Sequence, residues 1–188
     1  MYDVELVTSK TEVDCGPACL KMLLGYYGTE VSLDQLIEEC GCGIGGCSGK
    51  DLMRVGRTHG LDMTAFRMDA EELIRQDRPG IVWWMYQHWV VFCGTDDHGD
   101  VVIANPSRGR FAIDPESFGK MFTGVSLWNG EAENIIQRAA KPLAEGERFY
   151  LNGELCKAIT SIAKGAVLTL NTNYQTTTVE NEFNLLDL

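Results

Sequence analysis

The chain has 188 residues, 45% of them hydrophobic, and a formal net charge of -11 at pH 7. Such a chain is long and apolar enough to bury one real core, while its acidic balance argues against nucleic acid or an anionic membrane surface as the main partner. With no apolar run of about eighteen residues and no apolar signal segment in MYDVELVTSK (1–10), neither a membrane span nor a secretion signal is expected.

The first third of the chain predicts three helices, which begin after the capping residues Asp14, Ser32 and Ser48. In the first helix, Pro17 falls in the opening turn, where no amide needs a partner, and Gly28 is the expected end. Between the second and third helices, CGCGIGGCSG (40–49) is rich in glycine and is predicted to be a loop.

The middle of the chain changes to the period of β-strands. Strands are predicted at 63–68, 81–86, 88–94, 100–106, 110–114 and 125–128, with short helices at 70–77 and 115–122. The segment TDDHG (95–99) predicts the turn of a hairpin. Helices followed by a mostly antiparallel sheet indicate an α+β fold.

Three residues form a pattern that is typical of cysteine peptidases. Cys15 lies at a helix N-terminus, where unpaired amides and the helix dipole favour a thiolate and can bind an oxyanion. His88 begins one strand and Asn105 ends the next, so the amide oxygen can orient the imidazole. Taken singly, each residue also suits packing or turn chemistry, and only the joint pattern predicts catalysis.

Three segments, DCGPACLKMLLGYYGTEVSLDQL, GLDMTAFRM and HWVVFCGTDDHGDVVIANPSRGRFAIDPESFGKMFTGVSLW, resemble the double-glycine leader peptidases. These are papain-like domains at the front of bacteriocin-exporting transporters, and the resemblance covers about residues 8 to 128. It implies a papain-like fold, with Cys15 as the nucleophile, His88 as the general acid and base, and Asn105 as the residue that orients His88.

Two positions depart from that family. The family usually has Asp where this chain has Asn105, but an amide oxygen can also accept the imidazole N–H. The family also places a glutamine, which donates to the oxyanion, where this chain has Ser9. The loss of one such donor typically costs about 10² to 10³ in rate. Ser9, Lys10 and Thr11 are the candidate replacements.

The C-terminal part of the chain predicts a separate unit. Residues 1–128 form the peptidase domain, 129–146 read as a polar linker, and 147–188 form a small module with a hairpin at FYLNGELCKA. The module resembles C-terminal segments of structural proteins of tailed bacteriophages, including head-fibre and tail-associated proteins. This resemblance implies attachment to other phage structural proteins, and it is compatible with a homo-oligomer.

There are two alternatives to the proposed catalytic residues: a zinc site, and Asp114 in place of Asn105 as the orienting residue. The seven cysteines lack the spacing of a disulfide scaffold, so we expect thiols in a reducing cytoplasm. A zinc site could use Cys40, Cys42 and Cys47 with His59, but C-x-C-x4-C is not a standard ligand spacing, and no metal or other cofactor is expected. Asp114 is an alternative orienting residue that lies further along the chain from His88.

The function predicted from these observations is a cysteine peptidase. The resemblance alone implies cleavage after small residues, with Gly-Gly among the candidate sites. The enzyme would be made in a bacterial cytoplasm, encoded by a phage or prophage and associated with the virion. One alternative is a weak or inactive papain-like virion protein that binds peptide or decorates the particle. Another is an amidase that acts on cell-wall peptide crosslinks. A peptide or protein is the expected substrate, and neither nucleic acid nor a membrane is an expected partner.

Overall fold

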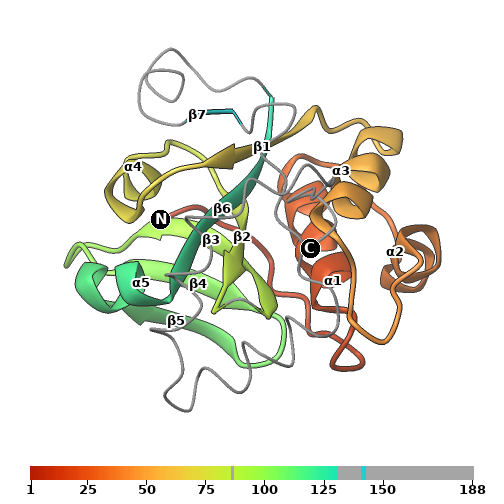
Figure 1. Cartoon of the computed structure of the whole chain (residues 1–188), viewed down its shortest axis with the longest axis horizontal. Coiled ribbons are helices and arrows are strands. Elements are labelled where there is room, and N and C mark those ends of the chain that lie inside the picture. The colour runs from red at the N-terminus through yellow and green to blue at the C-terminus, as the bar shows by residue number, and fades with distance from the viewer. Residues whose placement is uncertain (86, 131–140, 143–188) are drawn as a thin grey trace, which may run out of the picture.

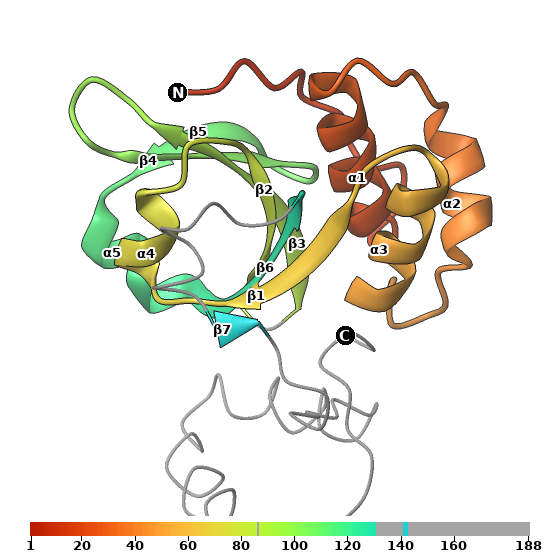
Figure 2. The same ribbon diagram turned by 90° about the horizontal axis from the view of Figure 1, so that it is seen from above.

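Three helices precede the sheet along the chain and gather beside it (Figure 1). The computed structural model describes residues 1–85, 87–130 and 141–142. The helices are α1 (Cys15–Tyr26), α2 (Leu33–Cys40) and α3 (Gly49–Thr58). Figure 2 shows them grouped on one side of the strands, with the two short helices α4 (Ala70–Ile74) and α5 (Pro115–Met121) on the other. The helix positions predicted from the sequence are confirmed.

The strands form one antiparallel sheet in the order β5-β4-β3-β2-β6-β1-β7. Their bounds are β1 (Met63–Arg67), β2 (Gly80–Trp84), β3 (His88–Thr95), β4 (Val101–Asn105), β5 (Gly109–Ile113), β6 (Phe122–Asn129) and β7 (Lys141–Pro142). The predicted strands and the turn at 95–99 are therefore present, and the α+β fold class is confirmed. Central strands β2, β3 and β4 lie consecutively in the sheet, and their hydrophobic runs are buried on both faces.

Alternate residues of β3 enter two different cores. Trp89 and Val91 pack with the helices α1 to α3, whereas Val90 and Phe92 pack with residues of α4 and α5 on the opposite face. This follows from the two-residue period of a strand. Each large apolar side chain that is fully buried contributes about 1.5–3 kcal/mol to folding. The first residue of β3, His88, is thereby held at the end of a strand that is anchored on both sides.

Two of the three predicted helix caps are confirmed, and one is wrong. Ser32 Oγ accepts from Gln35 N at 3.2 Å, and Ser48 Oγ accepts from Asp51 N at 3.1 Å. Asp14 occupies the cap position of α1, but its side chain makes no capping bond to that helix. Pro17 lies at the third helical position and has no N–H to donate to the cap, and the Asp14 carboxylate accepts instead from the backbone N–H groups of Lys10 and Thr11.

Residues 141–142, the described part of the chain beyond residue 130, join the sheet as β7. Within the predicted linker 129–146, Lys141 and Pro142 pair with Arg67 and Phe66 of β1. The rest of that linker and the predicted C-terminal module lie outside the described residues. Across the part of the chain that the structure describes, no helix is long and apolar enough to cross a bilayer.

Candidate active site

Cys15 is the first residue of α1, and its side chain is only 5% exposed. The first amides of a helix have no partner inside the helix, and at this terminus the N–H groups of Cys15 and Gly16 act on the Cys15 sulfur itself. A third N–H, that of Trp89 on β3, also acts on this sulfur. The thiol therefore lies where α1 meets the beginning of β3, close to Trp89, the residue that follows His88 in the sequence.

Several groups act in opposite directions on the acidity of this thiol. Burial raises the pKa of Cys15 above its ordinary value, while the N–H groups of Trp89 and Gly16 lower it. The adjacent Asp14 carboxylate raises the pKa by a smaller effect. Because the net direction is a rise, the neutral form of the thiol is favoured, and Cys15 needs a base to become a good nucleophile.

His88 and Asn105 are brought together by the antiparallel pairing of β3 with β4. The ring atom Nε2 of His88 lies 2.9 Å from Asn105 Oδ1. The same Oδ1 accepts from the backbone N–H of Ser107 at 2.9 Å, which identifies this atom as the amide oxygen. Nε2 must therefore carry the proton and donate it, which leaves Nδ1 of His88 unprotonated and able to accept one.

The environment of His88 keeps its ring neutral. Burial lowers the pKa of His88, the hydrogen bond to Asn105 raises it, and the Arg108 guanidinium lowers it again. The net direction is below the ordinary value of 6.5. A neutral imidazole near neutral pH is the form that can take a proton from a thiol. Within the described residues, no hydrogen bond joins the ring to the Cys15 sulfur in this substrate-free state.

The three side chains predicted to replace the missing glutamine all have other partners. Ser9 Oγ lies 3.5 Å from both Pro106 O and Ser107 Oγ, so it faces the turn after Asn105. The side chain of Thr11 donates to Asp14, and that of Lys10 pairs with Asp34. The Asp14 carboxylate also accepts from the backbone N–H groups of Lys10 and Thr11, at 3.0 and 2.8 Å. The donors that act on the Cys15 sulfur are the backbone N–H groups of Trp89, Gly16 and Cys15.

Asp114, the alternative orienting residue, serves a different purpose. Its side chain accepts from Ser117 N at 2.9 Å and caps α5. The capping bond lowers the pKa of this exposed carboxyl. No hydrogen bond of the described residues connects Asp114 with His88, whereas Asn105 contacts the ring directly.

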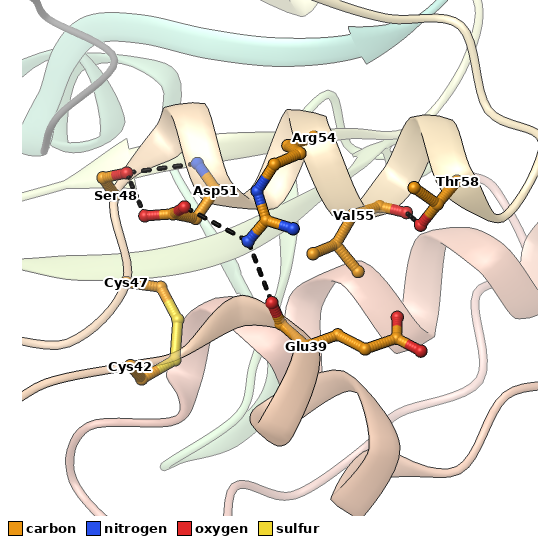
Figure 3. Close-up of polar contacts among 8 residues, drawn as sticks. All are labelled: Glu39, Cys42, Cys47, Ser48, Asp51, Arg54, Val55 and Thr58. Atoms are coloured by element: carbon orange, nitrogen blue, oxygen red, sulfur yellow. Dashed lines mark hydrogen bonds and ion pairs between the residues drawn. A yellow bond between two sulfur atoms is a disulfide. The ribbon is translucent and has the colours of Figure 1, made fainter.

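The expectation that all cysteines are thiols is wrong for two of them. Cys42 and Cys47 form a disulfide, so neither sulfur is free to bind zinc (Figure 3). His59 pairs with Glu39, with 2.6 Å between Nε2 and Oε2, and this contact ties α3 to α2. Among the described residues there is no group of three or more His, Cys, Asp and Glu side chains placed to hold a metal ion.

The sequence did not indicate that Trp89 links the candidate active site to the loop between α2 and α3. Its indole Nε1 donates to the backbone oxygen of Cys47 at 3.0 Å, while its own N–H acts on the Cys15 sulfur. The pairing of Cys42 with Cys47 was also missed, although one signal was present. The four residues between them are Gly-Ile-Gly-Gly, which can fold into a tight hairpin that brings the two sulfurs together.

Comparison with protein families and curated proteins gives one consistent result. The model of the peptidase C39 family matches residues 3–134. Over 131 residues, the chain is 32% identical to the lactococcin-G-processing and transport ATP-binding protein LagD of Lactococcus lactis subsp. lactis. That match covers 66% of this chain but 18% of the transporter, so the shared part is a small portion of the relative.

Solved structures show the same similarity. A double glycine motif protease from an AMS/PCAT transporter, crystallised in complex with the leader peptide, is 28% identical with a TM-score of 0.64. The match covers 74% of this chain and 92% of that protein. The peptidase domain of Streptococcus ComA, at 21% identity and a TM-score of 0.63, shares the fold; the match covers 69% of this chain and 99% of that domain.

Proposed function

Because the chain belongs to the peptidase C39 family of cysteine peptidases, we propose that it cleaves peptide bonds after small residues, with a Gly-Gly segment as the preferred site. Cys15 is the nucleophile, His88 the general acid and base, and Asn105 the residue that orients the imidazole. The choice of Gly-Gly is supported by the double glycine motif protease whose leader-peptide complex this fold resembles.

The reaction follows from the protonation states at the site. His88 Nδ1 accepts the thiol proton as Cys15 Sγ attacks the peptide carbonyl carbon, which forms a tetrahedral intermediate. The intermediate then collapses, the C–N bond breaks, and the imidazolium returns its proton to the departing amine. A water molecule hydrolyses the resulting thioester with His88 again acting as the base. Asn105 keeps the ring in one orientation throughout and its neutral form in one tautomer, because Asn105 Oδ1 is fixed by Ser107 N.

The oxyanion of the intermediate needs hydrogen-bond donors, and the family glutamine is absent. The N–H groups of Cys15 and Gly16 begin α1 and act on the sulfur that attacks. Both lie at the positive end of the helix dipole, which favours a developing negative charge. We assign these two amides as the oxyanion donors. Without the glutamine that the family places here, we expect turnover about 10² to 10³ slower than with that donor present.

The observation that carries this proposal is the His88–Asn105 hydrogen bond, with a defined tautomer, together with Cys15 at a helix N-terminus that meets the beginning of β3 at Trp89. The test is cleavage of a peptide that contains Gly-Gly, with a second peptide that has Leu-Leu at the same place. Wild type is compared with Cys15→Ala and with the matched control Cys19→Ala, which removes a buried cysteine one turn further along α1. Cleavage of the Gly-Gly peptide alone, lost in Cys15→Ala and kept in Cys19→Ala, is the expected result. Equal cleavage by Cys15→Ala refutes it.

A second candidate function is peptide binding without turnover. The observation that favours it is the engagement of Ser9, Lys10 and Thr11 with other partners, which leaves no side-chain donor for the oxyanion among the candidates named from the sequence. Under this candidate, wild type binds the Gly-Gly peptide as tightly as Cys15→Ala does, and no cleavage product forms on long incubation. Calorimetry of both proteins, with product analysis of the wild-type sample, distinguishes the two functions.

We also propose that residues 147–188 attach the peptidase to a phage particle. This proposal is supported by the sequence resemblance of that segment alone. Its test is fusion of residues 129–188 to an unrelated soluble protein, followed by sedimentation with particles of the host's prophage. Co-sedimentation of the fusion, but not of the carrier protein, is expected, and equal behaviour of the two contradicts the proposal.

A further inference from the structure

The loop between α2 and α3 is closed by a covalent bond next to the candidate active site. Cys42 and Cys47 form the disulfide, and the residues inside it fold into a small hairpin. Gly43 N donates to Gly46 O at 3.2 Å, and Gly46 N donates to Gly43 O at 3.0 Å. Cys47 is buried, while Ile44 at the tip is fully exposed. One side of this loop therefore faces the protein and the other faces solvent.

The buried side of the loop contacts both elements that carry the catalytic residues. On the β3 side, the Cys47 oxygen accepts from the indole of Trp89, the residue after His88. On the α1 side, a methyl group placed on Gly16, the residue after Cys15, would lie 3.3 Å from Cys47 Cβ. Cys47 thus lies against the neighbours of Cys15 and of His88 at the same time.

The ends of the loop are held by contacts that do not depend on the disulfide. Arg54 Nη2 donates to the Glu39 oxygen near the end of α2 at 2.9 Å, and lies 3.3 Å from Asp51 Oδ1 (Figure 3). Ser48 Oγ caps the beginning of α3 through Asp51 N. Loss of the S–S bond would therefore release residues 42–47 while α2 and α3 keep their mutual contacts.

We propose that the Cys42–Cys47 disulfide positions the catalytic pair, so that its reduction by a small dithiol lowers the catalytic rate. The inference rests on the proposed function, since it assigns a role in the same site. With the bond intact, Cys47 holds the Trp89 indole and packs on Gly16, which fixes the beginning of β3 against the beginning of α1. Without it, the buried indole N–H loses a fixed acceptor, and the distance between Cys15 and His88 is no longer set.

The redox step is a dithiol–disulfide exchange. A thiolate of the dithiol attacks one sulfur of the Cys42–Cys47 bond and forms a mixed disulfide, and the second thiolate of the reagent then displaces the protein sulfur. The dithiol loses two electrons and two protons and becomes a cyclic disulfide. Cys42 and Cys47 gain them and become thiols. The other cysteines of the described residues are free and buried, so none of them supplies a second exchangeable disulfide.

The test uses the full chain purified under air, the same chain after dithiol treatment and anaerobic removal of the reagent, and the double variant Cys42→Ser/Cys47→Ser. The first measurement is the rate at which iodoacetamide labels Cys15 at pH 7, read by peptide mass at that residue. The second is the split between kcat and KM on the Gly-Gly peptide. Reduction and the double substitution are each expected to lower the Cys15 labelling rate and kcat about tenfold, with KM little changed.

Two further variants separate positioning from loss of structure. Trp89→Phe keeps an aromatic ring at this position but removes the indole N–H together with part of the buried ring volume, so it is expected to have the low rate with or without dithiol. Ile44→Ser changes the exposed tip and keeps the disulfide, so its labelling rate should equal that of wild type and should fall on reduction. The double variant itself should not respond to dithiol.

The inference is overturned if labelling of Cys15 is unchanged or faster after reduction. It is also overturned if mass analysis finds Cys42 and Cys47 as free thiols in the protein purified under air. These outcomes are independent of the proposed peptidase activity, because alkylation needs no substrate. A chain that cleaves no peptide but shows the labelling difference would refute the proposed function and retain the positioning role of the disulfide.

Discussion

The orientation of the Asn105 amide decides which nitrogen of His88 is free to accept a proton. Its oxygen is fixed by Ser107 N and accepts from His88 Nε2. This buried residue therefore does more than fill a turn before Pro106. An amide here leaves the ring uncharged in the resting protein, whereas a carboxylate would favour the imidazolium.

Two substitutions of Asn105 test whether this residue orients the His88 ring and keeps it neutral. Asn105→Ala removes the acceptor of the ring proton, and we expect kcat to fall about 10²-fold because the ring loses its orientation. Asn105→Asp keeps the acceptor and adds a negative charge, which raises the pKa of His88. Because the neutral ring is the active base, the acid limb of the kcat/KM profile should move to higher pH in Asn105→Asp.

Profiles of kcat/KM from pH 4 to 9 for the wild type and both variants provide the measurement. An acid limb that stays in place in Asn105→Asp would show that His88 is not the group whose protonation stops the reaction. Ser107→Ala is a suitable control, since it leaves the backbone N–H that fixes the amide in place.

At the scale of elements, close contact between β2 and β6 leaves room only for glycine at one position. A methyl group on Gly80 would lie 2.6 Å from a ring atom of Trp128. The clash is with a fully buried aromatic ring that has little freedom to move. This contact explains why β2 begins with Gly80 and how β6 approaches the strand that leads to His88.

Gly80→Ala is therefore expected to destabilise the protein by about 1–3 kcal/mol, as overpacking of a core does. Gly25→Ala is the matched control. Gly25 lies within α1, and a methyl group there would have no neighbour within 4 Å. The control should gain about 0.5–1 kcal/mol from the higher helix propensity of alanine. Urea denaturation of the three proteins measures both effects, and equal midpoints would contradict the described packing.

The elements differ in how far they could be predicted from the sequence. The strands that carry His88 and Asn105 were predictable, because runs such as VVF and VVIA and the turn TDDHG are strong local signals. The cap of α1 was not, because Pro17 removes the amide that Asp14 would otherwise accept from, and the carboxylate instead binds Lys10 N and Thr11 N. The helix propensity of single residues cannot show that the amides of Lys10 and Thr11 take the Asp14 carboxylate away from the helix.

The candidate site shows the same division. The contact between His88 and Asn105 could be predicted because the two residues lie at facing ends of neighbouring predicted strands. The Trp89–Cys47 hydrogen bond could not, because it joins residues 42 positions apart whose contact depends on how the helices pack on the sheet. The engagement of Ser9 with Pro106 depends on tertiary structure in the same way.

At the scale of the whole molecule, buried titratable groups limit the pH range of stability. Burial lowers the pKa of His88 below 6.5, so the unfolded chain binds more protons than the folded one as the pH falls below 6.5, and stability decreases there. Burial raises the pKa of Cys40 to about 12 and of Cys93 to about 11, from 9.0. The unfolded chain loses those protons first above pH 9, so stability decreases there as well.

Thermal unfolding followed between pH 5 and 10.5 is expected to show its highest midpoint between about pH 6.5 and 9. Cys93→Ala removes one of the groups that ionise only on unfolding, so its midpoint should fall less steeply above pH 9 than that of wild type. In His88→Ala, the unfolding midpoint should likewise fall less steeply below pH 6.5 than in wild type. A wild-type midpoint that rises above pH 9 would contradict the burial of these thiols.

The central claim is that His88 activates Cys15, and the rate of Cys15 alkylation as a function of pH tests it most directly. Wild type, His88→Ala and Cys15→Ala are treated with iodoacetamide, and modification of Cys15 is read by peptide mass. We expect the wild-type rate to rise through an inflection below pH 6.5, where the imidazole loses its proton. In His88→Ala the rate should stay low until the pH exceeds the ordinary thiol value of 9.0. Identical profiles in wild type and His88→Ala would show that the imidazole does not act on the thiol, and the catalytic assignment would be wrong.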